Sequence, residues 1–99
     1  MTTIYVTHPR YVEHTLNGHP EHAGRIEAIW RRLDASDLSA RMTSVKASPA
    51  TPRQVEFVHD GEYIEMLRDL SGQYPNKTVM INPDTYFTPT SYDVALLAA

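Results

Sequence analysis

The clearest periodic feature of the chain is an apolar stripe in its first third. Four apolar side chains recur at the three- and four-residue spacing of one helix face. They are Ile26, Ile29, Trp30 and Leu33. Pro20 precedes them and suits the first turn of a helix, so we expect the helix to begin there. Trp30 is expected to anchor the core rather than to bind a ligand.

Short runs that favour strands flank this helix. The β-branched and aromatic residues Thr3–Val6 predict a first strand, and partial alternation over Arg41–Ala47 predicts a second. The polar segment Arg10–Gly18, which ends in the turn-forming pair Asn17-Gly18, predicts an exposed loop. The order strand, helix, strand indicates that the chain begins with a βαβ unit, in which the two strands are parallel.

Capping residues mark two helices in the middle of the chain. Thr51 precedes a proline and stands three residues before Gln54, the arrangement of a capping box. Asp60 is placed to cap a second, longer helix, and Gly72 to end it in a left-handed conformation. We expect a short helix from Thr51 and a longer one after Asp60.

The last quarter of the chain predicts a strand and a helix. Thr78–Ile81 is β-like, and a helix is expected to open at Thr88-Pro89 or at Thr90. This last helix runs into the apolar residues Leu96–Ala99 without a capping residue. We therefore expect the chain to be a single partial domain, residues 1–99, cut short within a helix.

Composition narrows the class of protein. The 99 residues are 41% hydrophobic and 21% charged, which suits one folded domain, and no apolar run approaches the ~20 residues of a membrane span. The chain has no cysteine, which excludes disulfides, iron–sulfur ligation and a cysteine nucleophile. A net charge of −3 gives no basic surface for nucleic acid or anionic lipid, so we expect neither partner. Since no secretory signal is visible, a cytoplasmic location is expected.

Four histidines near the N-terminus are the first candidates for chemistry. They are His8, His14, His19 and His22. Together with Glu13 and Glu21, neutral imidazoles of this kind could hold zinc or nickel. Their spacing is not that of a metal motif, and loop and cap roles are the more frequent ones for such residues. A histidine-based metal-binding module is therefore a less favoured hypothesis for this chain.

Carboxylates are the second group of candidates. Glu62 and Glu65 lie three apart on a predicted helix and could meet on one face, although a solvated face is the expected arrangement. Asp84 lies between Pro83 and a helix start, in a segment too polar for the core. It could cap a turn or face a ligand, and its chemistry alone favours the cap. No Gly-x-Ser-x-Gly turn or phosphate-binding glycine loop is present.

Three groups of residues stand in a fixed order along the chain. They are His14 with His19–Ile26, then Val58–Ile64, and then Asp84–Tyr86 with Thr88–Tyr92 and Ala95. Together they resemble the N-terminal part of the zinc-dependent histone deacetylase and acetylpolyamine amidohydrolase family. Family members show His-Pro-Glu-Arg and a second arginine, then Val-His-Ser-x-x-Tyr-Ile, then Asp-Thr and Pro-x-Ser before an alanine-rich helix. The resemblance implies an arginase-like α/β fold, a central parallel sheet with helices on both faces, of which this chain is the first portion.

The same resemblance implies that the catalytic residues lie elsewhere. In the family a zinc ion polarises an acetyl amide and activates water, with tandem histidines and a tyrosine assisting. The tandem-histidine and Asp-x-His motifs follow the alanine-rich helix in family members, and neither occurs in this sequence. The resemblance thus implies no catalytic residue, metal ligand or cofactor in this chain, and zinc in the full-length enzyme. Tyr63 and Tyr86 are not expected to replace the missing tyrosine.

Three positions match residues near the family's active site. Asp84 corresponds to the rim aspartate that accepts hydrogen bonds from substrate amides, so the resemblance implies substrate binding there. His22 stands where many members carry an arginine near the inner cavity, which leaves that role open. Arg25 matches the second arginine, for which a structural role beside the helix start is expected.

The expected function is therefore that of an N-terminal segment of a deacetylase-like amidohydrolase, inactive alone. Its full-length enzyme would act on acetylated amines such as acetyl-lysine or acetylpolyamine. The alternative is a stand-alone small protein that forms a homo-oligomer or associates with the remainder of the enzyme.

Overall fold

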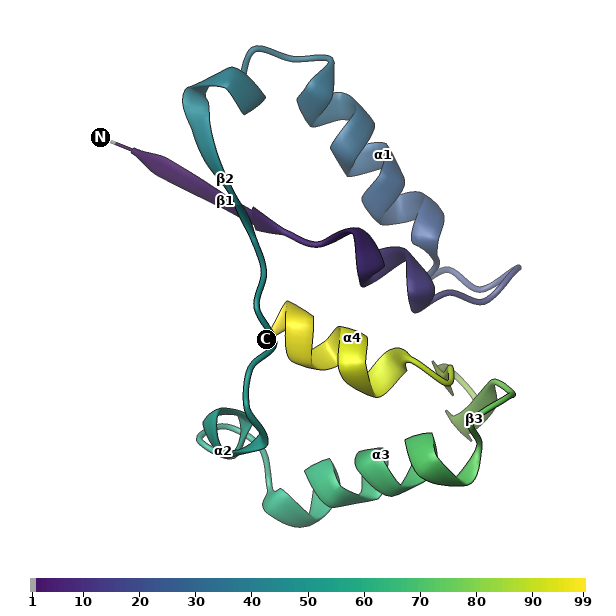
Figure 1. Ribbon diagram of the computed structural model, residues 1–99. Helices are drawn as coiled ribbons and strands as arrows, with labels where there is room; N and C mark the ends of the chain where they lie inside the picture. Colours follow the sequence, from purple (N-terminus) through teal and green to yellow (C-terminus); the bar gives the residue numbers. More distant parts are fainter. Residues whose placement is uncertain (1) are drawn as a thin grey trace.

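The first two strands of the chain pair in parallel (Figure 1). The structure is a computed structural model that describes residues 2–99. Strand β1 (Thr3–Thr7) pairs with β2 (Met42–Lys46), in register from Thr3 with Met42 to Thr7 with Lys46. Helix α1 (Ala23–Asp34) lies between them in sequence. The predicted βαβ order and the parallel pairing are confirmed.

Helix α1 begins later than predicted. Its N-cap is His22, whose ring Nδ1 accepts the N–H of Gly24 at 3.0 Å, and the N–H of Ala23 donates to Thr15 Oγ1 at 2.9 Å. The prediction of a start at Pro20 was wrong, because these two side chains satisfy the first backbone donors only from Ala23 onward. The segment before Ala23 is therefore part of a loop.

The apolar stripe of α1 is only partly covered. Trp30 is half-buried and donates its Nε1–H to Thr7 Oγ1 at 2.9 Å, which ties the helix to β1. Ile29, in the same stripe, remains 53% exposed. Trp30 thus anchors the helix to the strand, as expected, although its side chain is only half-buried.

The segment predicted to be an exposed loop is ordered and half-buried. Residues Pro9–Glu13 form a 3-10 helix, η1, whose N-cap His8 accepts the N–H of Arg10 at 3.0 Å. Tyr11 donates its hydroxyl to the carbonyl of Leu97, 3.1 Å away. Tyr11 gives the loop an anchor far along the chain, and a polar composition could not indicate it. Gly18, at φ +80°, makes the expected turn.

The capping predictions in the middle of the chain are confirmed. A second 3-10 helix, η2 (Ser39–Arg41), precedes β2, and Thr51 with Gln54 forms the capping box of α2 (Pro52–Val55). Asp60 accepts the N–H of Glu62 at 2.9 Å and caps α3 (Gly61–Gln73). The left-handed ending at Gly72 was wrong. The helix continues to Gln73, and Tyr74 closes it with an N–H bond to Leu70.

The last third contains a strand that the sequence did not reveal. Strand β3 (Val79–Asn82), predicted one residue earlier, pairs antiparallel with β4 (Thr85–Phe87), with an irregularity between Met80 and Asn82. Strand β4 is only three residues long and falls between turn and helix signals, which leaves too few positions for a period to show. Helix α4 (Ser91–Ala98) follows with Thr90 as its N-cap, as expected, although no side chain caps it.

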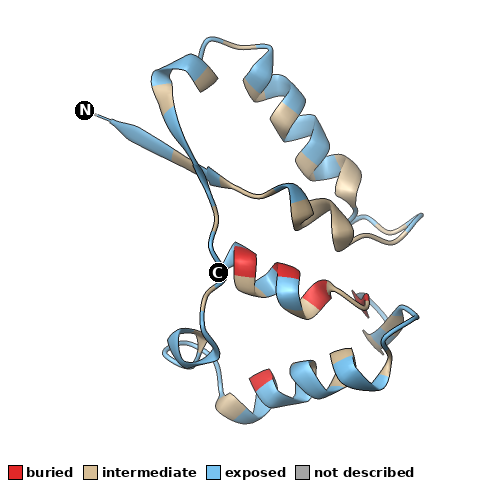
Figure 2. Cartoon of the chain, viewed as in Figure 1, coloured by how far each residue is buried: buried red, intermediate tan, exposed pale blue. Residues whose placement is uncertain are grey.

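The core of the described chain lies in its second half. Buried apolar side chains sit on α3, β4 and α4 (Figure 2). They are Ile64, Tyr86, Phe87, Val94 and Leu97. By contrast Ile4 and Val6, on one face of β1, are 62% and 54% exposed. No helix in residues 2–99 is long and apolar enough to cross a membrane.

Candidate functional site

Asp84 lies in the tight turn between β3 and β4. Its N–H donates to Asn82 Oδ1 at 2.9 Å, and its side chain is exposed. Asn82 therefore caps the turn, and the expectation that Asp84 itself would act as the cap was wrong. Within residues 2–99 the Asp84 carboxylate has no hydrogen-bond or ion-pair partner, so it can accept one from outside.

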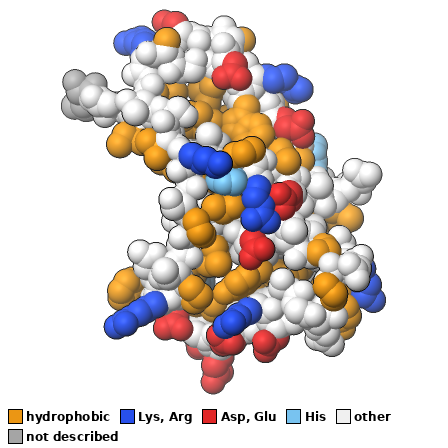
Figure 3. All heavy atoms as spheres, in the orientation of Figure 1, with side chains coloured by type: hydrophobic (Ala, Val, Ile, Leu, Met, Phe, Trp, Pro, Cys, Tyr) orange, Lys and Arg blue, Asp and Glu red, His pale blue; other side chains and the backbone are white. Residues whose placement is uncertain are grey.

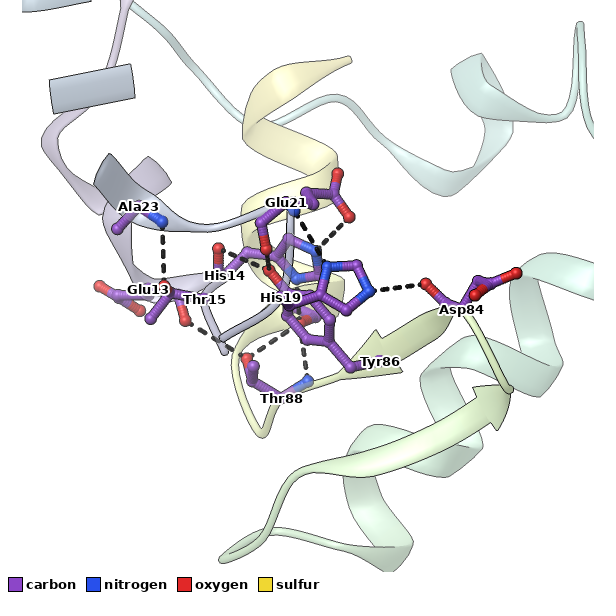
Figure 4. Close-up of polar contacts among 10 residues, drawn as sticks. Glu13, His14, Thr15, His19, Glu21, Ala23, Asp84, Tyr86 and Thr88 are labelled. Carbon is purple, nitrogen blue, oxygen red and sulfur yellow. Dashed lines mark hydrogen bonds and ion pairs between the residues drawn. The ribbon is translucent and has the colours of Figure 1, made fainter. Parts of the chain in front are cut away.

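His19 bonds to this turn from the loop before α1 (Figure 4). Its Nε2 lies 2.9 Å from the backbone oxygen of Asp84, and its Nδ1 accepts the N–H of Glu21 at 3.0 Å. His19 and Asp84 are 65 residues apart in the sequence. His19 thus joins the N-terminal loop to the β3–β4 hairpin.

Tyr86 lies at the centre of a cluster of side chains that also contains His14, His19, Glu21 and Ser91. Only 1% of the surface of Tyr86 is exposed. Its hydroxyl donates to the carbonyl of Glu21 at 2.7 Å and lies 3.3 Å from that of His14. Its ring stacks on His14, with centroids 4.4 Å apart, and makes a T-shaped contact with the His19 ring, with centroids 4.9 Å apart. Burial, reinforced by the Glu21 carboxylate, raises the pKa of Tyr86. The phenol therefore stays protonated, as a hydrogen-bond donor, to a higher pH than an exposed tyrosine would.

Ser91 completes the cluster in an arrangement that resembles a nucleophile relay. Its Oγ lies 2.6 Å from His14 Nδ1, and His14 Nε2 lies 3.5 Å from the Glu21 carboxylate. The serine is only 5% exposed, and its Oγ also accepts the N–H of Thr88 at 2.8 Å. A nucleophile needs open access to substrate. The contacts indicate that Ser91 instead fixes the start of α4 to the N-terminal loop.

The other two of the four N-terminal histidines have cap roles, as the sequence led us to expect. His8 caps η1 and His22 caps α1, each through its ring Nδ1. In the described part of the chain, no group of three His, Asp or Glu side chains lies close enough to hold a metal ion. The residues considered for a zinc or nickel site therefore do not converge.

The other charged candidates lie apart from this cluster. Glu62 and Glu65 are exposed on α3, and Glu65 lies 3.8 Å from Arg68. Arg25 is exposed in the first turn of α1 and forms no ion pair within residues 2–99. The Arg10 guanidinium, 2.9 Å from Glu13, lowers the pKa of that carboxyl. None of these groups faces a second functional side chain.

A groove of about 570 Å³ opens beside the cluster. Its lining is mostly apolar and comes from α1, α3, the hairpin and α4, with His14, Glu21 and Ser91 at its polar side. The apolar part includes Ile26, Ile29, Tyr63, Leu67, Val94 and Ala98. Figure 3 shows hydrophobic side chains open to the surface across the face of the molecule drawn there. The groove is large enough to receive side chains of another polypeptide segment.

The family of this chain follows from comparison with known proteins. Residues 19–99 match the sequence profile of the histone deacetylase domain, which covers both the His19–Asp84 contact and the hairpin. The chain belongs to the histone deacetylase family.

Individual relatives agree with this assignment. A probable deacetylase of Methanothermobacter thermautotrophicus is 34% identical over 96 residues, which cover 97% of this chain and 28% of that protein. Human histone deacetylase 9 is 31% identical over 70 residues, 68% of this chain and 7% of that protein. The chain therefore spans about a quarter of the probable deacetylase it matches.

A solved structure shows the fold. The crystal structure of the HDA15 HD domain superposes with a TM-score of 0.85 at 23% sequence identity, covering 99% of this chain and 29% of that one. The α/β fold class is thus confirmed, and the chain corresponds to a portion of a larger domain fold.

The sequence indicated Asp84 but not its surroundings. The His14–Ser91 and His19–Asp84 contacts join residues 77 and 65 positions apart. No local period or spacing in one sequence connects residues at such separations. Ser91 stood out in the sequence only as part of the Pro-x-Ser resemblance, which gave no indication of its contact with His14.

Proposed function

We propose that residues 1–99 form the N-terminal part of a single deacetylase domain whose full-length enzyme hydrolyses acetylated amines, such as acetyl-lysine or acetylpolyamine, in the cytoplasm. The match of residues 19–99 to the histone deacetylase domain carries this proposal. The proposal is also supported by the 28% share of the probable deacetylase that the chain covers. In this view the chain supplies scaffold and part of the substrate rim.

The catalytic centre is proposed to lie outside these residues. Zinc would supply a Lewis acid for the amide carbonyl and activate water in the full enzyme. The donors in this chain do not fit such a site, because His8 and His22 cap helices and no three donors converge in residues 2–99. We therefore propose that the chain is inactive alone.

Asp84 is the residue proposed to contact substrate. Its backbone N–H is held by Asn82 and its backbone oxygen by His19, while the carboxylate is exposed. A carboxylate fixed in this way can accept N–H bonds from a substrate, and charge strengthens such bonds. Asp84 would thereby orient the acetylated amine at the rim.

We propose that the remainder of the domain packs on the groove and on the open face of β1. The Cα radius of gyration is 15.4 Å, against about 13 Å for a compact chain of 100 residues. Ile29 in the groove is 53% exposed, and Ile4 on β1 is 62% exposed. Surfaces of this kind are normally covered in a complete domain. A second copy of the chain is the alternative occupant.

Two kinetic measurements test the proposed function. In the full-length enzyme, Asp84→Asn is expected to raise KM about tenfold, with a smaller change in kcat, because it removes a charged acceptor worth about 1.5 kcal/mol or more. Asp69→Asn, an exposed carboxylate on α3, is the matched control and should leave KM unchanged. Equal KM values for Asp84→Asn and the unaltered enzyme would contradict the substrate role.

Residues 1–99 alone, supplied with zinc, should not deacetylate an acetyl-lysine peptide or an acetylpolyamine. Metal-dependent turnover by this chain would contradict its proposed inactivity. Sedimentation of the same chain distinguishes the two proposed occupants of the groove, which are the remainder of the domain and a second copy of the chain. Concentration-dependent dimers that persist when the remainder of the domain is added would favour the homo-oligomer.

A further inference from the structure

Three histidines of the chain share one local arrangement. In His8, His19 and His22 the ring Nδ1 accepts the backbone N–H two residues further on, each at 3.0 Å. A ring nitrogen that accepts a hydrogen bond carries no proton, so each ring carries its proton on Nε2. The local contact therefore turns Nε2 of each histidine into a donor.

Only His19 uses this donor on a distant part of the described chain. Its Nε2 lies 2.9 Å from the backbone oxygen of Asp84, whereas no partner lies within bonding distance of Nε2 of His8 or His22 in residues 2–99. Because Nδ1 is occupied as an acceptor, the bond direction is fixed: His19 donates and the Asp84 carbonyl accepts.

Glu21 closes these contacts into a ring. Its N–H donates to His19, and its carbonyl accepts the hydroxyl of Tyr86 at 2.7 Å. Tyr86 follows Asp84 by two residues, on β4, and its ring makes a T-shaped contact with the His19 ring, with centroids 4.9 Å apart. The turn that carries Asp84 is thus bonded on one side through His19 and on the other through Tyr86.

The Asp84 backbone is held at both of its polar groups. The carbonyl accepts from His19, and the N–H donates to Asn82 Oδ1 at 2.9 Å. Two fixed backbone bonds restrict the position of Cα and leave only side-chain rotation to the exposed carboxylate. A group ordered before binding loses less entropy when it binds.

We propose that His19 is a positioning residue that holds the Asp84 carboxylate toward the N–H groups of the substrate. The proposal rests on the proposed substrate role of Asp84. His19 acts through the backbone of Asp84 and does not touch the substrate itself. Its loss is expected to weaken substrate binding while leaving the chemical step in place.

Two substitutions of His19 separate its two bonds. Asparagine at position 19 keeps an oxygen for the Glu21 N–H, as in an Asx turn, but cannot reach Asp84. Glutamine extends to the position of Nε2 and retains an amide donor for Asp84. His8→Asn is the matched control, since His8 has the same local bond and no contact with Asp84.

In the full-length enzyme, His19→Asn is expected to raise KM about three- to tenfold with kcat within twofold, the effect of one lost hydrogen bond. His19→Gln and His8→Asn should keep KM within twofold of the unaltered enzyme. The double variant with Asp84→Asn should show no higher KM than Asp84→Asn alone. Independent, multiplying effects of the two substitutions would overturn the proposal.

Hydrogen exchange of the Asp84 amide gives a readout that does not depend on activity. Exchange should accelerate in His19→Asn and stay unchanged in His19→Gln and His8→Asn. If Asp84→Asn leaves KM unchanged, the substrate role fails, and the exchange rates still show whether His19 orders the turn. If Asp84→Asn raises KM while His19→Asn changes neither KM nor exchange, the positioning role alone is overturned.

Discussion

The imidazole of His14 lies flat against the phenol ring of Tyr86, with ring centroids 4.4 Å apart and ring planes 13° from parallel. The stack joins the loop after β1 to strand β4. Tyr86 also bonds to the carbonyl of Glu21 in the same loop. Together with the bond from His19 to the Asp84 carbonyl, this buried side chain holds the N-terminal loop to the β3–β4 hairpin, which carries Asp84.

Removal of the Tyr86 hydroxyl tests this junction. Tyr86→Phe keeps the ring stack but leaves the Glu21 carbonyl without its donor at 2.7 Å. We expect a loss of about 1–3 kcal/mol in the free energy of unfolding, the cost of an unsatisfied polar group. Denaturant titration measures this difference. Tyr92→Phe is the control, since the Tyr92 hydroxyl has no hydrogen-bond partner in residues 2–99, and it should be nearly neutral.

High pH should act on the same residue. Burial and the Glu21 carboxylate raise the pKa of Tyr86 above the ordinary value near 10. A raised folded-state pKa contributes stability that is present below the unfolded pKa and is lost as pH rises through the folded pKa. We expect the tyrosinate absorbance of Tyr86 to appear together with unfolding. Tyr86→Phe should remove this step and Tyr92→Phe should retain it. Ionisation of Tyr86 along with exposed tyrosines, in a folded protein, would contradict the burial argument.

Two helical glycines should respond in opposite directions to alanine. A Cβ at Gly24 would lie 2.6 Å from Cε1 of the His22 ring, whereas a Cβ at Gly72 would meet nothing within 4 Å. Gly72→Ala is expected to stabilise the protein by about 0.5–1 kcal/mol, the helix preference of alanine. Gly24→Ala should instead destabilise the protein, because the His22 ring must leave its cap position and the N–H at position 24 loses its acceptor.

A double-mutant cycle on thermal unfolding isolates the contact at Gly24. In a His22→Ala background, Gly24→Ala should become stabilising, as it is at Gly72. A stabilising effect of Gly24→Ala in the presence of His22 would show that the ring is not held over the helix start.

The bond between Trp30 and Thr7 tests the attachment of α1 to the sheet. Thr7→Val removes the oxygen that accepts the Trp30 Nε1–H at 2.9 Å and keeps the β-branched shape. We expect a loss of about 0.5–1.5 kcal/mol and a change in tryptophan fluorescence. Thr3→Val, an exposed residue at the other end of β1, should change neither quantity.

Local signals were read correctly where the deciding contacts are local. The capping box of Thr51 and Gln54 and the Asp60 cap are each formed between residues two or three positions apart. The end of α3 shows where a local signal gave the wrong prediction. Gly72 permits a left-handed turn, but the bond from Tyr74 to Leu70 let the helix continue beyond it.

The sequence by itself determined the strand–helix–strand beginning, the caps that start α2 and α3, and the family to which the chain belongs. These depend on motifs formed by side chains close together along the chain. The tertiary structure decided the setting of Asp84. His19, which bonds to the turn, is 65 residues from Asp84 in the sequence, and Tyr86 is two residues from it. Strand β4 is too short for an alternating hydrophobic pattern to be recognised in the sequence. A hydrogen bond between distant residues forms only after the backbone has folded around them, so no short-range pattern encodes it.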